Sequence, residues 1–432
     1  MPESQVEAQK LAYLEELFAK AFGEALADEA TVSQGTVSPN SRPFFVLASA
    51  PGRMEVAGNH VDHQGGRVIS AAIAERTWGL AAPNGTGRIR VVMEGFGIDE
   101  IDLDEAGWDV PRKVERQEPS ALVRGMAAAF AARGGQLRGF DLVTCSDVPP
   151  GCGLSSSAAF EVMVGACLEG LFGGAAVAPD GFLRLDPVAL ALAGVDAEQR
   201  FFGKPCGAQD QLASACGGAV LLDFAEAVPT VTPIEFDAEG AGFAAVLVDS
   251  RQDHSLHNDE FAAIPADMRM VANALGASRL GDIEVDALLS RIGELRAELG
   301  DHRVMRALHY FDEVDRVNRQ AAALAAGDFG LFLRCVRLSG ASSAQFLQNV
   351  SLRDPGSETR QPAMVIQSLA AHLLGERGAW RIHGGGFGGS VLAFVPADEA
   401  AAFTEAMDGL LGYEACRQVE VGGAGVRARR LS

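Results

Sequence analysis

Three glycine-rich segments, each beside a short apolar run, constrain the fold of this chain most. The first, APGRMEVAGNHVDHQGG, lies between the apolar runs 44–48 and 67–74. The second is PPGCGLSSSAA at 149–159, and the third is HGGGFGGS at 383–390, which precedes the apolar run VLAFV. Glycine has no Cβ and accepts positive φ, so such segments let a ligand approach the backbone closely. A surface turn explains one such segment, whereas three beside predicted strands indicate ligand-binding loops.

The middle segment has the form of an anion-binding site. A predicted strand at 141–146 leads into it, and a helical apolar pattern begins at Ser155 and continues to Cys167. A helix N-terminus presents unpaired N–H groups and the positive end of its dipole, and three serine hydroxyls stand there. This is not a Walker loop, because no Gly-Lys-Ser/Thr follows. An ordinary serine-capped helix is the alternative, but the Pro-x-Gly-x-Gly-Leu before the serines favours a phosphate site.

The length of the chain indicates two domains. It has 432 residues, 48% of them hydrophobic, whereas single cores stop growing at roughly 250–300 residues. The last predicted strand and helix make an α+β ending, and a change in the sequence pattern places the domain boundary near residue 217, giving domains 1–217 and 218–432. Helices are predicted at 6–26, 121–132, 155–167, 188–200, 283–298, 304–326, 328–339, 362–375 and 400–411. Strands are predicted at 44–48, 88–93, 141–146, 217–224, 244–250 and 391–395, with a loop at 31–43.

The charge and the cysteines limit the class of protein. A formal charge of −21 disfavours nucleic acid and anionic membranes as partners, and solubility alone explains such acidity. The seven cysteines are odd in number and lack CxxC spacing, which disfavours a disulfide framework or a structural zinc site. The N-terminal stretch lacks a signal-peptide core, and no apolar run reaches the roughly 20 residues of a membrane span. We expect a cytoplasmic protein that is a monomer or a weak dimer.

The motifs together resemble the superfamily of kinases named for galactokinase, homoserine kinase, mevalonate kinase and phosphomevalonate kinase. PPGCGLSSSAA resembles its phosphate-binding motif, and HGGGFGGS resembles its late G-G-G-F-G-G motif. APGRMEVAGNHVDHQGG is similar to the galactokinase signature GR-x-N-L-I-G-E-H-x-D-Y, and AEQRFFGKPCGAQDQLAS to the galactokinase segment that carries the catalytic aspartate. The motifs follow the family's order between residues 50 and 390.

The resemblance implies a fold, a reaction and a set of site residues. It implies a two-domain α+β small-molecule kinase with its active site in the interdomain cleft, ATP as co-substrate and Mg²⁺ as cofactor. Phosphoryl transfer needs positioning and charge neutralisation more than covalent chemistry. Asp210 is then the catalytic base and Arg53 its charged partner. ATP binding falls to Gly151, Gly153, Leu154, Ser155, Ser156 and Ser157, and Mg²⁺ to Ser157 and Glu198. Sugar recognition falls to His60, Asp62, Gly207 and Asp210, with Asn59 and Phe261 at positions where family members contact the sugar.

Judged from the sequence alone, these residues have plainer explanations. Arg53 fits a structural ion pair, Glu198 fits a solvated helix face, and a lone histidine such as His60 is usually a satisfied surface or core residue. The glycines at 384–389 fit a tight turn that positions the following strand. The resemblance favours the functional interpretation in each case.

The sequence departs from the family pattern in the sugar-binding motifs. Asn59 replaces the glutamate of G-E-H-x-D-Y, His63 replaces its tyrosine, and Glu55 replaces the asparagine of GR-x-N. Phe261 stands where a tyrosine gives a hydroxyl to the sugar, and its loss removes a hydrogen bond of about 0.5–1.5 kcal/mol. These changes leave the phosphoryl-transfer residues in place. They affect the residues that select the sugar, so the identity of the sugar stays open.

Four functions follow from this pattern. The first is a galactose 1-kinase that gives galactose 1-phosphate and ADP. The second is a 1-kinase for a related hexose, pentose, uronic acid or amino sugar. The third is a sugar and ATP sensor without catalysis, which the intact catalytic residues disfavour. The fourth is a mevalonate or homoserine kinase, which the galactokinase-like segments disfavour.

Overall fold

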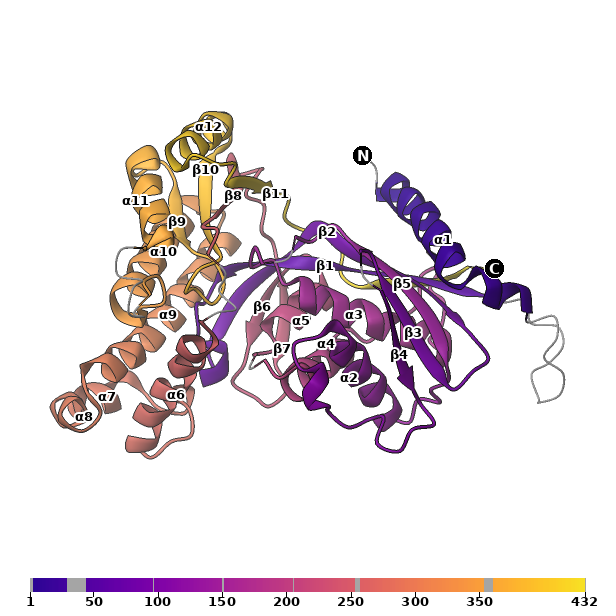
Figure 1. Ribbon diagram of the computed structural model, residues 1–432. Coiled ribbons are helices and arrows are strands. Elements are labelled where there is room, and N and C mark those ends of the chain that lie inside the picture. The colour runs from indigo at the N-terminus through magenta and orange to yellow at the C-terminus, as the bar shows by residue number, and fades with distance from the viewer. Residues whose placement is uncertain are drawn as a thin grey trace.

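The structure of the protein is a computed structural model with two modules (Figure 1). It describes residues 3–28, 44–95, 97–149, 151–204, 206–252, 257–352 and 360–431. The loop predicted at 31–43 lies outside these residues. One module is built on an eight-stranded sheet and the other on a four-stranded sheet. Both contain helices, so the predicted α+β class is confirmed.

The larger sheet has the strand order β12-β1-β2-β5-β3-β4, and β6 and β7 continue it from β2. Its strands are β1 (Phe45–Ala57), β2 (Arg67–Pro83), β3 (Arg88–Met93), β4 (Ile98–Asp102), β5 (Phe140–Ser146), β6 (Ala219–Asp223), β7 (Thr230–Ile234) and β12 (Arg427–Leu431). Strand β2 is 17 residues long, so one of its edges pairs with β6 over 67–71 and with β5 over 77–83. The long β1–β2 pair therefore reaches from one module towards the other (Figure 1).

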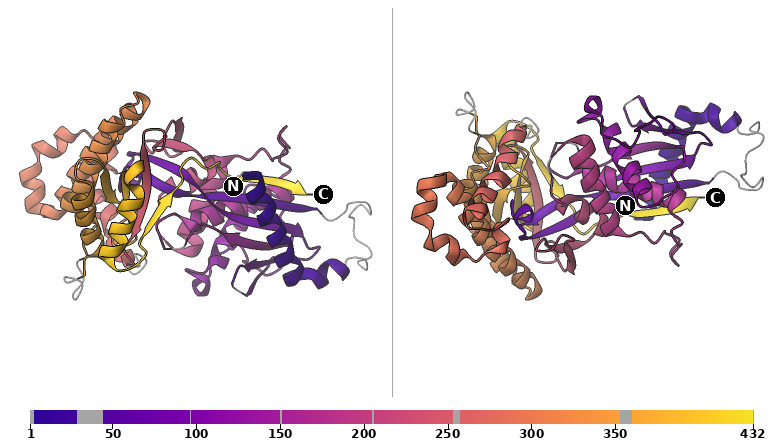
Figure 2. Two further views of the ribbon diagram at one scale, coloured as in Figure 1. Left: turned by 90° about the horizontal axis from the view of Figure 1, so that it is seen from above. Right: turned by 90° about the horizontal axis from the view of Figure 1, so that it is seen from below.

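Helices cover both faces of this sheet. Four pack on one face: α2 (Pro119–Ala132), α3 (Ser156–Leu168), α4 (Pro187–Asp196) and α5 (Gln209–Cys216). Helix α1 (Glu3–Asp28) lies on the other face (Figures 1 and 2). Its Leu14 and Phe18 are buried against apolar residues of the sheet such as Trp78. The predicted N-terminal helix is therefore confirmed.

The smaller sheet is antiparallel, with the order β11-β8-β10-β9. Its strands are β8 (Phe243–Asp249), β9 (Ala379–Ile382), β10 (Ser390–Pro396) and β11 (Cys416–Val419). Side chains alternate along β8: Val246 and Val248 pack with α11 (Pro362–Leu374) and α12 (Ala400–Leu411), and Leu247 packs towards α9 (Asp301–Ala325) and α10 (Phe329–Ser342). The alternation is that of a strand buried on both faces. Helices α6 (Asn258–Ala274), α7 (Val285–Ser290) and α8 (Ile292–Leu299) complete this module.

Two predicted elements were wrong. The first glycine-rich segment was predicted as a loop, but β1 continues through Ala57. Two register shifts against β2, at Pro51/Arg53 and Glu55/Ala57, absorb the irregular residues without ending the strand. The helix predicted at 283–298 is two short helices, α7 and α8, divided at Arg291.

The larger sheet takes β6, β7 and β12 from beyond residue 217. Strands from both sides of residue 217 therefore share one sheet. The division into 1–217 and 218–432 remains a prediction.

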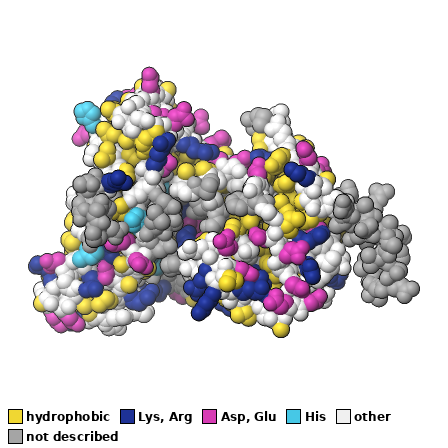
Figure 3. Space-filling view, in the orientation of Figure 1, with side chains coloured by type: hydrophobic (Ala, Val, Ile, Leu, Met, Phe, Trp, Pro, Cys, Tyr) yellow, Lys and Arg dark blue, Asp and Glu magenta, His cyan; other side chains and the backbone are white. Residues whose placement is uncertain are grey.

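The apolar helix of the phosphate segment is a core helix. In the described part of the chain, one helical run, Ser156–Gly173, has the length and composition to cross a membrane, and 67% of it is buried inside the fold. All seven cysteines are unpaired thiols. On the face shown in Figure 3, acidic and basic side chains are interspersed.

Candidate active site

The candidate active site is a cavity of about 230 Å³ lined by residues of both modules. The larger module contributes the end of β1, the phosphate segment and the start of α5, and the smaller contributes α6 and the loop after β9. The wall contains most of the predicted site residues: Arg53, His60, Asp62, Gly151, Gly153, Leu154, Ser155, Ser156, Ser157, Gly207, Asp210 and Phe261. Asn59 and Glu198 are not part of the wall.

Arg53 and Asp210 form the charged centre of the cavity. Arg53 Nε donates to Asp210 Oδ1 at 2.8 Å, and its Nη1 donates to the carbonyl oxygen of Gly153 at 2.5 Å. Burial would raise the pKa of Asp210, but Arg53 and the hydroxyl of Ser155 together hold that pKa below its ordinary value. Asp210 is therefore a carboxylate at neutral pH, with 30% of its side chain exposed to the cavity.

Ser155 joins this centre to the phosphate segment. Its hydroxyl donates to Asp210 Oδ2 at 2.5 Å and does not cap α3. Its backbone is left-handed, with φ +56°, a conformation that non-glycine residues adopt rarely. The serine-cap explanation of this residue is thus wrong. The first turn of α3 is left open towards the cavity, where its N–H groups and the hydroxyl of Ser156 are available to an anion.

A cluster of acidic side chains lies behind the phosphate segment. Glu198 Oε1 accepts hydrogen bonds from Ser157 Oγ at 3.0 Å and from Lys204 Nζ at 3.1 Å. Gln211 Nε2 donates both to Glu198 Oε2 at 2.8 Å and to Glu161 Oε2 at 3.0 Å. Burial, and next the charge of Glu198, raises the pKa of Glu161 well above its ordinary value. Glu198 is 2% exposed, so the solvated-face explanation of this residue is wrong.

The residues present fit a magnesium ion at this point. Ser157 and Glu198 place a hydroxyl and a carboxylate side by side at the open turn of α3. Among the described residues no three His, Cys, Asp or Glu side chains form a protein-only metal cluster. Mg²⁺ is usually held by one or two carboxylates together with water and substrate phosphates, which matches this donor set.

The opposite side of the cavity carries the predicted sugar-binding residues. His60 Nε2 donates to the carbonyl oxygen of Gly385 at 2.8 Å, and its ring lies 5.1 Å from that of Phe261. Burial lowers the pKa of His60 to about 3, so its imidazole is neutral. A Cβ at Gly207 would lie 1.8 Å from Asp62 Oδ2, so a larger residue at this position would displace the carboxylate. Burial raises the pKa of Asp62 to about 6.

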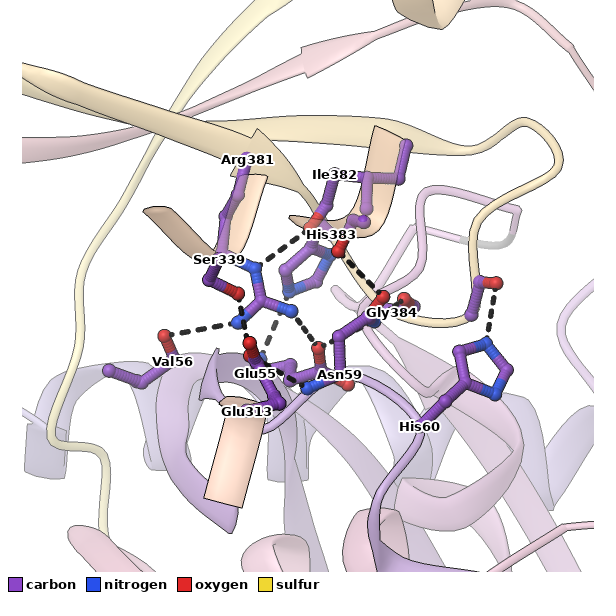
Figure 4. A network of polar contacts seen from close by, with 12 residues as sticks. Glu55, Val56, Asn59, His60, Glu313, Ser339, Arg381, Ile382, His383 and Gly384 are labelled. Carbon is purple, nitrogen blue, oxygen red and sulfur yellow. Dashed lines mark hydrogen bonds and ion pairs between the residues drawn. The ribbon is translucent and has the colours of Figure 1, made fainter. Parts of the chain in front are cut away.

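Asn59 lies in a buried polar network instead of the cavity (Figure 4). Its Nδ2 donates to the carbonyl oxygen of Gly384 at 2.7 Å, and its Oδ1 accepts from Asn349 at 2.8 Å and from Ser343 at 3.1 Å. The contact of Asn59 with the sugar stays a prediction; in this structure both ends of its amide are hydrogen-bonded within the protein and the residue has no exposed surface.

The sequence interpretation missed several residues of the wall. Lys204 approaches Glu198 and lines the cavity. His383 accepts a hydrogen bond from the backbone N–H of Glu55 through Nε2 at 3.0 Å, and its Nδ1 lies 3.2 Å from where a Cβ at Gly153 would be. A lone lysine or histidine has no spacing signature, and the only sequence signal was its position beside a motif.

Two family models match the chain in these regions. Residues 39–83 match the galactokinase galactose-binding signature, and residues 121–218 match the N-terminal domain of the GHMP kinases, the superfamily described above by its four members.

Solved structures share the fold of nearly the whole chain. A galactokinase from Lactococcus lactis, complexed with galactose, is 24% identical with a TM-score of 0.76, covering 96% of this chain and 99% of that chain. A mevalonate kinase from L. major, in complex with R-mevalonate, is 17% identical with a TM-score of 0.56, covering 91% and 100%. A phosphomevalonate kinase from Streptococcus pneumoniae, in complex with phosphomevalonate and AMPPNP, is 13% identical with a TM-score of 0.57, covering 86% and 99%.

The fold matches that of small-molecule kinases of the GHMP type, and the phosphate segment lies within the region that matches their N-terminal domain. Within these kinases, the match to the galactose-binding signature is a likeness to galactokinases. The chain is thus similar to the galactokinase branch of the GHMP kinases, and the two matches indicate a phosphotransferase that acts on a sugar hydroxyl.

Proposed function

We propose that the protein is an ATP-dependent sugar 1-kinase that phosphorylates galactose at its anomeric hydroxyl. The observation that carries the proposal is the contact of Asp210 with both Arg53 and Ser155. It joins the proposed acceptor side of the cavity to the phosphate segment. The galactose complex of the L. lactis neighbour and the galactose-binding signature support galactose as the first substrate to test.

The chemistry assigned to these residues is an in-line transfer. The anomeric oxygen bonds to the γ-phosphorus of ATP while the bond from that phosphorus to the β–γ bridging oxygen breaks, and ADP leaves. Asp210 accepts the hydrogen bond of the sugar hydroxyl, orients it and takes up its proton as the transfer proceeds. Because the low pKa of Asp210 makes it a weak base, orientation is its larger contribution.

The phosphate side is proposed to stabilise charge. The N–H groups at the start of α3 bind the phosphate oxygens, and Arg53 stabilises the negative charge of the transition state. Ser157 and Glu198 would hold Mg²⁺, which neutralises phosphate charge when bound. Leu154, which is buried, fixes the segment through its carbonyl oxygen, which accepts from the N–H of Arg53 at 3.0 Å.

A 1-kinase for a related sugar is the second candidate, and the sugar side of the cavity favours it. Asn59 is withdrawn into the buried network, and Phe261 offers no hydroxyl. The cavity therefore has fewer hydrogen-bonding groups there than the family motif supplies. A pentose, an amino sugar or a uronic acid are the members of this class to compare with galactose. A cytoplasmic location and a monomeric or weakly dimeric state remain predictions.

The test of the reaction is ADP release with Mg-ATP and a panel of sugars. The panel contains galactose, talose, 2-deoxygalactose, galactosamine, N-acetylgalactosamine, galacturonate, glucose and arabinose. We expect the highest kcat/KM with galactose and a phosphorus-31 NMR signal of a sugar 1-phosphate. A clearly better sugar would transfer the proposal to that substrate. No ADP release with any sugar, together with thermal stabilisation by ATP and sugar, would support a sensor instead.

The test of the centre is the variant Asp210→Asn. It keeps the shape of the side chain but removes the negative charge that orients and deprotonates the hydroxyl. We expect kcat to fall by about 10²–10⁴-fold and the Kd for ATP to stay close to that of the wild type. Asp223→Asn is the matched control, since Asp223 forms an Arg–Asp pair of 2.7 Å with Arg67 outside the cavity wall. Turnover of Asp210→Asn at the wild-type rate would refute the role of Asp210.

A further inference from the structure

We infer that Lys204 is a second cationic residue for the transferred phosphoryl group. Its ammonium group moves away from Glu198 and binds a γ-phosphate oxygen of ATP. This inference rests on the proposed function. Lys204 follows the π-helical turn Ala197–Phe202, and its backbone N–H donates to the carbonyl oxygen of Glu198 at 3.1 Å. The side chain lines the same cavity as Ser155, Ser156 and Ser157. Its base is thus fixed, while 38% of its side chain is exposed to the cavity.

The hydrogen bonds around Glu198 permit Lys204 to move. Glu198 Oε1 also accepts from Ser157, and its Oε2 accepts from Gln211. The carboxylate therefore keeps two donors when the ammonium group turns away. Among the described residues the hydrogen bond of Lys204 Nζ goes to Glu198 alone, which leaves further N–H groups of the ammonium for a ligand.

Arg53 is held more firmly than Lys204. Its Nε is held by Asp210 and its Nη1 by the carbonyl oxygen of Gly153. Lys204 lines the same cavity as Asp210, and its side chain is a point charge on a flexible stem. Lysine side chains are ordinarily charged in the pH range of an assay.

A purely structural role predicts a different result. If Lys204 served only to neutralise Glu198 and the neighbouring Glu161, its removal would destabilise the fold and would affect ATP and ADP alike. A contact with the γ-phosphate affects ATP and spares ADP. The comparison of the two nucleotides therefore separates the two roles.

The experiment measures the Kd of Mg-ATP and of Mg-ADP by titration calorimetry without sugar. The variants are Lys204→Met, which removes the charge, Lys204→Gln, which keeps a donor towards Glu198, and Lys204→Arg, which keeps the charge. We expect Lys204→Met and Lys204→Gln to weaken ATP binding by about tenfold or more and ADP binding by less than about twofold, with Lys204→Arg between them and the wild type. Arg200→Met is the control, because Arg200 lies in the same turn, pairs with Asp196 and is outside the cavity wall.

Equal effects on ATP and ADP, or no effect on either, would overturn the inference. If Lys204→Met has a lower thermal midpoint, Lys204→Gln and Lys204→Arg still decide the matter. Since these titrations need no sugar, they are independent of the reaction. A wild-type protein that releases no ADP with any sugar would refute the proposed function and leave the nucleotide comparison to be judged by itself.

Discussion

Asp62 is the carboxylate of the sugar-binding side whose titration falls within an ordinary assay. Burial raises its pKa to about 6, and the charge of Asp210 contributes to this rise. The two histidines of that side do not titrate there, because burial lowers the pKa of both His60 and His63 to about 3. Asp210 is ionised throughout, since its pKa lies below its ordinary value.

We therefore predict an acid limb in the pH profile of kcat/KM for the sugar. Above pH 6 the ionised Asp62 accepts hydrogen bonds from the sugar. Below its pKa of about 6 the protonated form accumulates, and kcat/KM should fall by about tenfold for each pH unit. Steady-state kinetics between pH 4.5 and 8 would measure this limb. The variant Asp62→Asn should lower kcat/KM at pH 8 and remove the inflection; an unchanged acid limb in that variant would assign the titration to another group.

For single residues, the sequence predicted well which residues lie around the site but predicted poorly where their side chains point. The motifs selected Arg53, Asp210 and the three serines, and the structure brings them together around one cavity. The motif also selected Asn59, whose direction is decided by Asn349 and Ser343, both more than 280 residues away in the chain. A local pattern does not contain such long-range contacts. The catalytic and binding roles themselves remain predictions.

Three helical elements meet behind the phosphate segment, and their junction fixes Glu198. Glu161 comes from α3, Gln211 from α5, and Glu198 from the π-helical turn after α4. Gln211 donates to both carboxyl groups through one nitrogen. The raised pKa of Glu161 means that the folded protein holds a proton on this group at a pH where the unfolded chain has released it.

The variant Glu161→Gln tests this junction. When folding raises the pKa of a carboxyl group, the protein becomes less stable as the pH rises above the pKa of that group in the unfolded chain, about 4.5 for glutamate. The free energy of unfolding then falls by up to about 1.4 kcal/mol per pH unit. Glutamine does not titrate, so the thermal midpoint of Glu161→Gln should rise relative to the wild type between pH 5 and 8. We expect kcat within about twofold of the wild type, because Glu161 lies outside the cavity wall. Melting curves at several pH values would measure the difference.

The control for this junction is Glu169→Gln, which removes a partly exposed carboxylate of the same helical region. Its midpoint should follow that of the wild type at every pH. A difference between Glu161→Gln and the wild type that stays constant from pH 5 to 8 would show that Glu161 is already ionised in the folded protein.

Helices and strands were predictable where one pattern dominates. The apolar runs predicted β3 and β10, and the amphipathic patterns predicted α9, α11 and α12. The prediction failed in β1, where glycine and proline indicated a loop but pairing with β2 continues the strand to Ala57. Propensity is a weak guide where tertiary pairing supplies the hydrogen bonds.

The two modules are joined by a buried ion pair at the end of β1. Arg381 on β9 bonds to Glu55 on β1, and its other nitrogens donate to the carbonyl oxygens of Ile382 and Val56 (Figure 4). Arg381 has no exposed surface, and burial raises the pKa of Glu55. The chain separates these partners by more than 320 residues, so no sequence motif could have paired them. A buried ion pair of this kind is costly to break from one side only.

We predict that Arg381→Met lowers the free energy of unfolding by about 3–5 kcal/mol, because it leaves the carboxylate of Glu55 buried without its charged partner. The double variant Arg381→Met/Glu55→Gln should recover a large part of this loss, since it buries no unpaired charge. Denaturant unfolding of the full chain would measure both. Arg417→Met is the matched control: Arg417 on β11 pairs with Glu75 on β2 at 2.9 Å but is 45% exposed, so its loss should cost less than about 1 kcal/mol. If the double variant were as unstable as the sum of Arg381→Met and Glu55→Gln, the two side chains would be acting independently, and the contact between the modules would depend on the rest of the buried network around Asn59.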